Sequence, residues 1–149
     1  MAEIRFYHLV RGSLEDVLPR MLDLTLARGQ RAVVLLGSAE RVEALNAHLW
    51  TFDPGSFLPH GGARDGHAAR QPVWLTHIDE NPNQAGYLFV ADGARSERVA
   101  DYARVSEIFD GRDDDAVAEA RRRWTAYKAQ GHAIEYWQQG ERGGWEQKA

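Results

Sequence analysis

The sequence contains no cysteine, which removes several kinds of chemistry from consideration. Without a thiol, the chain cannot form disulfide bonds, use a thiolate nucleophile or bind a metal through cysteine ligands. Long apolar runs are missing as well. No segment approaches the roughly 20 apolar residues that span a bilayer, and the N-terminal MAEIRFYHLV lacks the apolar core of a signal peptide. We therefore expect a soluble protein that works in the cytoplasm.

An excess of positive charge is also missing. The 18 lysines and arginines are outnumbered by 22 acidic residues, which gives a formal net charge of −4. Such a chain is a poor general binder of nucleic acid, so any basic site must be local. The 149 residues are 44% hydrophobic and 27% charged, a composition typical of one folded domain.

The motifs of nucleotide binding and nucleophilic catalysis are absent too. The turn at residues 8–13 is HLVRGS, which matches neither the dinucleotide fingerprint nor the Walker lysine loop. Gly37-Ser38 could offer backbone N–H groups to a phosphate, but two residues are a weak signal. His60, Asp65 and His67 share a loop, yet their spacing matches no established metal site. We therefore expect no enzyme activity, no cofactor and no metal.

Hydrophobic periodicity predicts alternating strands and helices. The nearly continuous apolar run at 31–36 is typical of a parallel strand buried on both faces. This pattern favours an α/β fold, a Rossmann-like three-layer α/β/α arrangement with a mostly parallel sheet of about five strands. Residues 1–137 form the predicted single domain, and residues 138–149 a polar, flexible tail. The expected strands are 4–9, 31–36, 73–78, 86–90 and 105–109.

The clearest predicted helix covers residues 113–130. It opens with three aspartates, whose negative charges stabilise a helix N-terminus. The glycine that follows it is the residue that best tolerates the left-handed conformation at a helix C-terminus. At 100° per residue, Val117 and Trp124 fall on one apolar arc, and Arg121 and Lys128 border it. Such a surface suits an anionic, partly apolar partner. The alternative is that both cations only lay their alkyl chains along the apolar border.

A second functional interpretation of this helix stays open. Arg121 to Arg123 beside Trp124 could hold phosphates while the indole stacks on a base, which would make the helix a direct nucleic-acid-binding module. The negative net charge and the shortness of the basic segment favour a protein partner instead.

Several segments occur in an order that resembles one family. FYHL, ARGQRAVVLL, ALNAHLW, DPGSFLPHG and AEARRRWTAYKAQGH are similar to the chi subunit of the bacterial DNA polymerase III holoenzyme, over residues 4–137. The resemblance implies a non-enzymatic adaptor with a Rossmann-like fold. In that family, chi joins the clamp loader, through a small partner called psi, to the acidic C-terminal tail of the single-stranded DNA-binding protein. That tail ends in proline and phenylalanine with a free carboxylate.

The resemblance also implies roles for individual residues. Arg121 matches the arginine that takes the terminal carboxylate, and Trp124 matches the aromatic position beside it. Trp50 matches a tryptophan that contributes to partner contacts, and we expect it to bind the tail together with the residues of the last helix. Phe57 matches an aromatic residue of the psi-side surface.

One position departs from the family pattern. Val117 stands where the family can have a lysine, one turn before the arginine, so one charge contact is missing. Lys128 or Arg122 could replace that contact.

Overall fold

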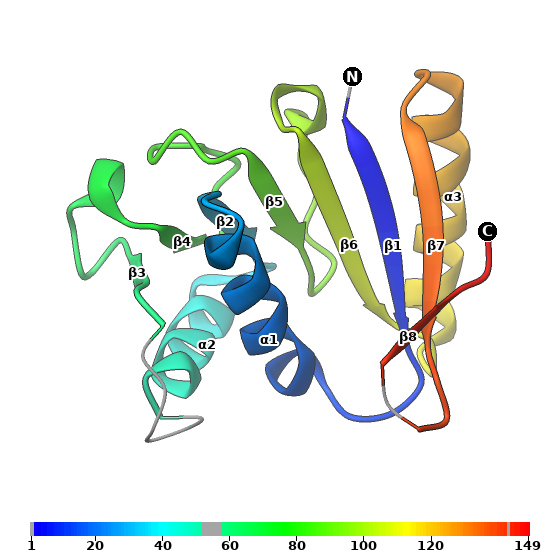
Figure 1. Cartoon of the computed structure of the whole chain (residues 1–149), viewed down its shortest axis with the longest axis horizontal. Coiled ribbons are helices and arrows are strands. Elements are labelled where there is room, and N and C mark those ends of the chain that lie inside the picture. The colour runs from blue at the N-terminus through cyan, green and yellow to red at the C-terminus, as the bar shows by residue number, and fades with distance from the viewer. Residues whose placement is uncertain (1, 52–57, 143) are drawn as a thin grey trace.

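A computed structural model describes residues 2–51, 58–142 and 144–149 of the chain. Its described residues form one open sheet of eight strands with three α-helices (Figure 1). No helix in these residues is long and apolar enough to cross a bilayer. The strands are β1 (Glu3–Leu9), β2 (Ala32–Leu35), β3 (Gly61–Gly62), β4 (Val73–Thr76), β5 (Tyr87–Val90), β6 (Arg104–Asp110), β7 (Ala133–Gln139) and β8 (Trp145–Gln147). The helices are α1 (Leu14–Ala27), α2 (Ala39–Thr51) and α3 (Asp114–Ala129), with two short 3-10 helices at Ala68–Arg70 and Val99–Asp101.

The strand order is β3-β4-β2-β5-β6-β1-β7-β8. Neighbouring strands are parallel throughout, except that β8 runs antiparallel to β7. The first two strands of the chain are therefore not neighbours, because β5 and β6 lie between them. The N-terminal strand instead pairs with β6 on one side and β7 on the other, and these are the strands that α3 contacts.

Helices cover both faces of the sheet. Alternate residues of each strand point to opposite faces, so the sheet supports two separate hydrophobic cores. One core joins Tyr7 and Val34 to α1 and α2, and the other joins Phe6 and Val33 to α3. In Figure 1, α1 and α2 lie together over one part of the sheet, and α3 runs along β7 at its far side. The exposed side chains of α2 and α3 consequently lie on opposite sides of the sheet.

Helix α1 contains a proline, and the helix next to it compensates for the lost hydrogen bond. Pro19 has no N–H with which to bond the carbonyl oxygen of Glu15 four residues earlier. The imidazole Nε2 of His48 on α2 lies 2.9 Å from that oxygen. This hydrogen bond ties α2 to α1.

The sequence predicted the elements from β1 to α3 well, apart from the short strand β3, and it predicted the C-terminal part poorly. Each of the five expected strands is present, but the expected count is too low because β3, β7 and β8 were missed. The predicted domain boundary at residue 137 falls inside β7. Residues 138–149, predicted to be a polar tail, contribute the end of that strand and all of β8, where the Trp145 ring packs edge-on against Tyr7 at 5.0 Å.

These contacts predict that the C-terminal residues stabilise the domain. The side-chain oxygen of Gln139 accepts hydrogen bonds from the N–H groups of Val10 (2.7 Å) and Arg11 (3.0 Å). A chain that ends at residue 140 loses the Trp145 packing and should be less stable by about 1–3 kcal/mol. A chain that ends at residue 137 also loses these two hydrogen bonds, at a further cost of about 0.5–1.5 kcal/mol for each. Urea unfolding of the two truncations beside the full chain measures both steps; equal stability of all three would contradict this role.

Candidate functional site

Helix α3 begins and ends where its local sequence requires. The Asp113 side chain accepts hydrogen bonds from the backbone N–H groups of Asp115 (3.0 Å) and Ala116 (3.3 Å), which caps the N-terminus. Gly131, with φ of +85°, follows the C-terminal end in the left-handed conformation that glycine tolerates best. Both predicted ends of the helix are confirmed. Which side chains face outward then depends on how the helix is rotated about its own axis, that is, on its rotational phase.

A buried carboxylate fixes that phase. Glu107 on β6 is 4% exposed and lies 2.8 Å from Nη1 of Arg123. The Tyr127 hydroxyl, one turn further along α3, donates a 2.8 Å hydrogen bond to the same carboxylate. Burial raises the pKa of Glu107, whereas the Arg123 guanidinium and the Tyr127 hydroxyl act in the opposite direction. Arg123 and Tyr127 must therefore point toward the sheet.

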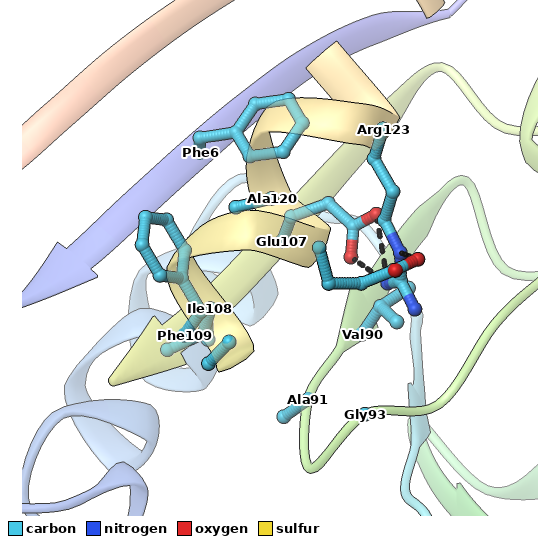
Figure 2. A pocket seen from close by; sticks show the side chains of 11 residues that line it. Phe6, Val90, Ala91, Gly93, Glu107, Ile108, Phe109, Ala120 and Arg123 are labelled. Carbon is cyan, nitrogen blue, oxygen red and sulfur yellow. Dashed lines mark hydrogen bonds and ion pairs between the residues drawn. The ribbon is translucent and has the colours of Figure 1, made fainter. Parts of the chain in front are cut away.

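Figure 2 shows this contact at the inner flank of α3, where the Glu107 and Arg123 side chains meet beside Val90. The small cavity there has a volume of about 60 Å³ and is lined partly by Phe6, Ala120 and Phe109. It has room for a few water molecules but not for a side chain of a partner. The outer flank of the helix is the part that a partner can reach.

The predicted binding residues occupy that outer flank. Val117, Arg121, Trp124 and Lys128 follow one another at helical spacing on α3, so they form one continuous strip, which we call the α3 face. Arg121 and Lys128 are exposed, and neither side chain has a hydrogen bond or ion pair with any residue that the structure describes. Val117 and Trp124 are partly buried.

The arginines that follow Arg121 in the sequence are not available in the same way. Arg122 lies 2.7 Å from Glu119, and Arg123 is held by Glu107 at 2.8 Å and Glu119 at 3.1 Å. Hydrogen bonds from these arginines lower the pKa of the Glu119 carboxyl, which keeps it charged and paired. Of the three arginines, Arg121 alone has no acidic partner among the residues that the structure describes.

A layer of aromatic rings holds the Trp124 indole in place. Its centroid lies 5.6 Å from the Phe6 ring on β1 and 6.1 Å from the Tyr136 ring on β7. Phe109 on β6 packs against Tyr136 at 6.2 Å. Since Trp124 is packed on two strands and still partly exposed, it offers a rigid apolar surface.

Tyr136 belongs to this site but was not found from the sequence. Its hydroxyl shares a hydrogen bond with Nδ1 of His8, which fixes the ring under α3. Burial raises the pKa of the Tyr136 hydroxyl, and the positive charge of Arg121 opposes that shift. Recognising Tyr136 required a strand at Ala133–Gln139, which the sequence analysis did not assign.

The remaining predicted contact residues lie elsewhere. Trp50 is 50% exposed near the end of α2, and its ring packs on His60 with the centroids 4.3 Å apart. Because α2 and α3 cover opposite faces of the sheet, Trp50 does not share a surface with Arg121. Phe57 falls outside the described residues.

The described residues also bear on the metal and nucleotide hypotheses. Both ring nitrogens of His60 lie near backbone carbonyl oxygens, at 2.6 Å from Leu58 and 3.3 Å from Asn46. No group of three or more potential ligands gathers among the described residues. At the Gly37 turn, a Cβ atom would lie 2.4 Å from the Asp92 carbonyl oxygen, so this turn packs closely against the backbone at Asp92.

Comparison with known proteins agrees with these observations. The family model described as "DNA polymerase III chi subunit, HolC" matches residues 1–135. The chain belongs to the DNA polymerase III chi subunit family. A curated relative, "Probable DNA polymerase III subunit chi" of Rickettsia prowazekii (strain Madrid E), is 29% identical over 108 residues. That match covers 70% of this chain and 66% of the relative, so it spans just under two thirds of the relative's length.

Membership in the chi family places this chain among the subunits of a replicative polymerase. The matched region contains the whole α3 face but ends one residue before Tyr136. The family match therefore covers every residue of the α3 face.

The Glu107 contact predicts unequal effects for two acidic residues that bind the same arginine. Removing the buried partner in Glu107→Ala leaves Arg123 without its main counter-charge and should cost about 3–5 kcal/mol of unfolding free energy. Glu119→Ala removes a partly exposed carboxylate and should cost less than about 1 kcal/mol. Chemical denaturation of both variants measures the difference. Similar losses for the two would mean that Glu107 does not anchor the helix.

Proposed function

We propose that this chi-family chain is a non-catalytic adaptor that binds the acidic C-terminal tail of single-stranded DNA-binding protein on its α3 face. A separate surface links it to the clamp loader through psi or an equivalent partner. The observation that supports this proposal best is Arg121, an exposed guanidinium without an acidic partner among the described residues, beside the fixed and partly exposed ring of Trp124.

The chemistry of the α3 face suits a tail that ends in phenylalanine with a free carboxylate. Arg121 can donate two parallel hydrogen bonds to that carboxylate, the geometry that guanidinium groups favour. The phenyl ring then packs between Trp124 and Val117, near the edge of Tyr136. Lys128, exposed one turn beyond Trp124, attracts the acidic residues that precede the phenylalanine and replaces the lysine absent at Val117.

The expected strength of this contact is modest. Burial of a phenyl side chain contributes roughly 1.5–3 kcal/mol, and a hydrogen bond to a charged group about 1.5–3 kcal/mol. Several kcal/mol are lost when a flexible tail becomes ordered. The dissociation constant should therefore be on the order of micromolar and should weaken with salt. Several tails on one partner would raise the effective affinity.

Direct nucleic-acid binding by α3 is the weaker alternative. It needs several cations free for phosphates, but Arg122 and Arg123 are paired with Glu119 and Glu107. Among the described residues of the helix, Arg121 and Lys128 are the cations without an acidic partner. Two such charges suit one carboxylate and a short acidic segment better than a phosphate backbone.

The second partner has a different place on the molecule. Trp50 lies on the face opposite α3 and is half exposed, so we assign it to the psi side rather than to the tail. Phe57, also assigned to that side, lies outside the described residues. An adaptor with contacts on opposite faces can hold both partners at the same time.

A fluorescent peptide that ends in Asp-Pro-Phe tests the tail assignment by anisotropy. Arg121→Ala should weaken binding about 10- to 150-fold, the equivalent of the 1.5–3 kcal/mol of a charged hydrogen bond. Arg122→Ala is the matched control, because this neighbouring arginine is paired with Glu119 and should leave affinity nearly unchanged. A peptide without the final phenylalanine should bind at least tenfold more weakly. Equal losses for the two arginine variants would indicate binding by general charge and contradict the proposal.

A further inference from the structure

A second groove lies on the face opposite α3. It has a volume of about 480 Å³ and runs between α1 and the exposed surface of β5, β6 and β1. Helix α1 forms one wall with Val17, Met21 and Leu24, and Trp145 of β8 stands at the other side. A cavity of this size lies within the range of sites that bind small molecules or short peptide motifs. We call it the α1 groove.

The groove is rich in positive charge for a chain with a net charge of −4. Four arginines line it, and the one acidic residue in its lining, Asp16, is already bonded to the backbone N–H of Ser13 at 2.8 Å. The lining arginines are Arg5, Arg20, Arg28 and Arg104.

These arginines differ in what they already bind. Arg5 and Arg104 share Glu3, at 2.8 Å and 3.5 Å, and Nε of Arg104 is buried without a hydrogen-bond partner. Arg20 and Arg28 on α1 are exposed and form no ion pair with any residue in the described part of the chain. The rim of the groove therefore carries two cations available to an incoming anion, above a floor with one unsatisfied donor.

An exposed aliphatic side chain lies between those two cations. Leu24 is 45% exposed, one of three large hydrophobic residues with such exposure among those described. It is four residues from Arg20 and four from Arg28, the residue that follows the last turn of α1, so the three side chains lie in one row along the helix and its C-terminal end. With Met21 and Val17 behind it, this row presents aliphatic area and positive charge at regular spacing.

The aromatic residues of the groove argue against a nucleic acid as the occupant. Single-stranded nucleic acids bind by stacking bases on open aromatic faces. Here the Arg104 guanidinium covers the Tyr87 ring at 5.0 Å from its centroid. Tyr7 is buried and in edge contact with Trp145. Among the apolar side chains that line the groove, the aliphatic Leu24 is the most exposed, which suits leucine-like side chains of a protein partner.

We propose that the α1 groove docks a short acidic segment of a partner protein, with aliphatic side chains against Leu24 and Met21 and carboxylates at Arg20 and Arg28. The inference does not depend on the tail-binding role of α3, because the two surfaces lie on opposite faces of the sheet. The segment is an amphipathic one, since apolar side chains must enter the groove while acidic ones reach its rim.

Selection from a random library of 12-residue peptides displayed on phage tests this proposal. The full chain is the target of the selection. Peptides that bind elsewhere on the chain are first removed by counter-selection against the double variant Arg20→Glu/Arg28→Glu. The selected peptides should combine several acidic residues with leucine, isoleucine or methionine. A labelled copy of the leading peptide should bind the double variant at least tenfold more weakly than the unchanged chain.

A matched control distinguishes a contact in this groove from an effect of the overall charge of the chain. Arg64→Glu/Arg70→Glu makes the same charge change at two exposed positions outside the groove and should leave affinity within about twofold. Leu24→Ser, which tests the aliphatic contact without a change in charge, should also weaken binding severalfold. Circular dichroism checks that each variant is folded.

Three outcomes would overturn the proposal. Selected peptides without acidic residues would show that the arginines do not determine the partner. If no selected peptide binds Arg20→Glu/Arg28→Glu more weakly than the unchanged chain, the groove is not the binding site. Tight binding of a 30-residue oligothymidylate that competes with the peptide and is lost in Arg20→Glu/Arg28→Glu would assign the surface to nucleic acid instead.

Discussion

The buried contact between Glu107 and Arg123 determines what the rest of α3 can do. A carboxylate that is 4% exposed needs a counter-charge, and Arg123 supplies it from the helix above. Successive residues of a helix are rotated by 100°, so a residue two positions earlier points in nearly the opposite direction. Because Arg123 faces the sheet, Arg121 faces outward. One internal ion pair thus explains why two arginines two positions apart have opposite roles, one structural and one available to a partner.

The sheet separates the functions of the molecule. Its alternating side chains support one core under α3 and another under α1 and α2, so surfaces on the two sides can act independently. The α3 face combines free cations with a fixed indole, and the α1 groove combines free cations with aliphatic side chains. Both surfaces are local regions of positive charge on a chain with a net charge of −4. That arrangement suits the adaptor role that we propose for the chain.

Local signals in the sequence were sufficient for α3 and insufficient for its surroundings. The aspartates and the glycine at its ends, and the spacing of its apolar residues, predicted the helix and its two ends correctly. The pairing of Arg123 with Glu107 joins residues sixteen positions apart on different elements, and no local pattern reveals it. Tyr136 was missed because no strand was assigned to the segment HAIEYW, which lies between the last predicted helix and the predicted polar tail. It becomes a strand because β1 and β8 supply hydrogen bonds on both sides.

The central claim is that Arg121 and Trp124 together hold the terminal phenylalanine of an acidic tail. A crystal structure of the chain with a peptide that ends in Asp-Pro-Phe measures this most directly. The account predicts the terminal carboxylate at hydrogen-bond distance from the Arg121 guanidinium and the phenyl ring against Trp124 and Val117. A peptide found in the α1 groove or beside Trp50, with the α3 face empty, would contradict it.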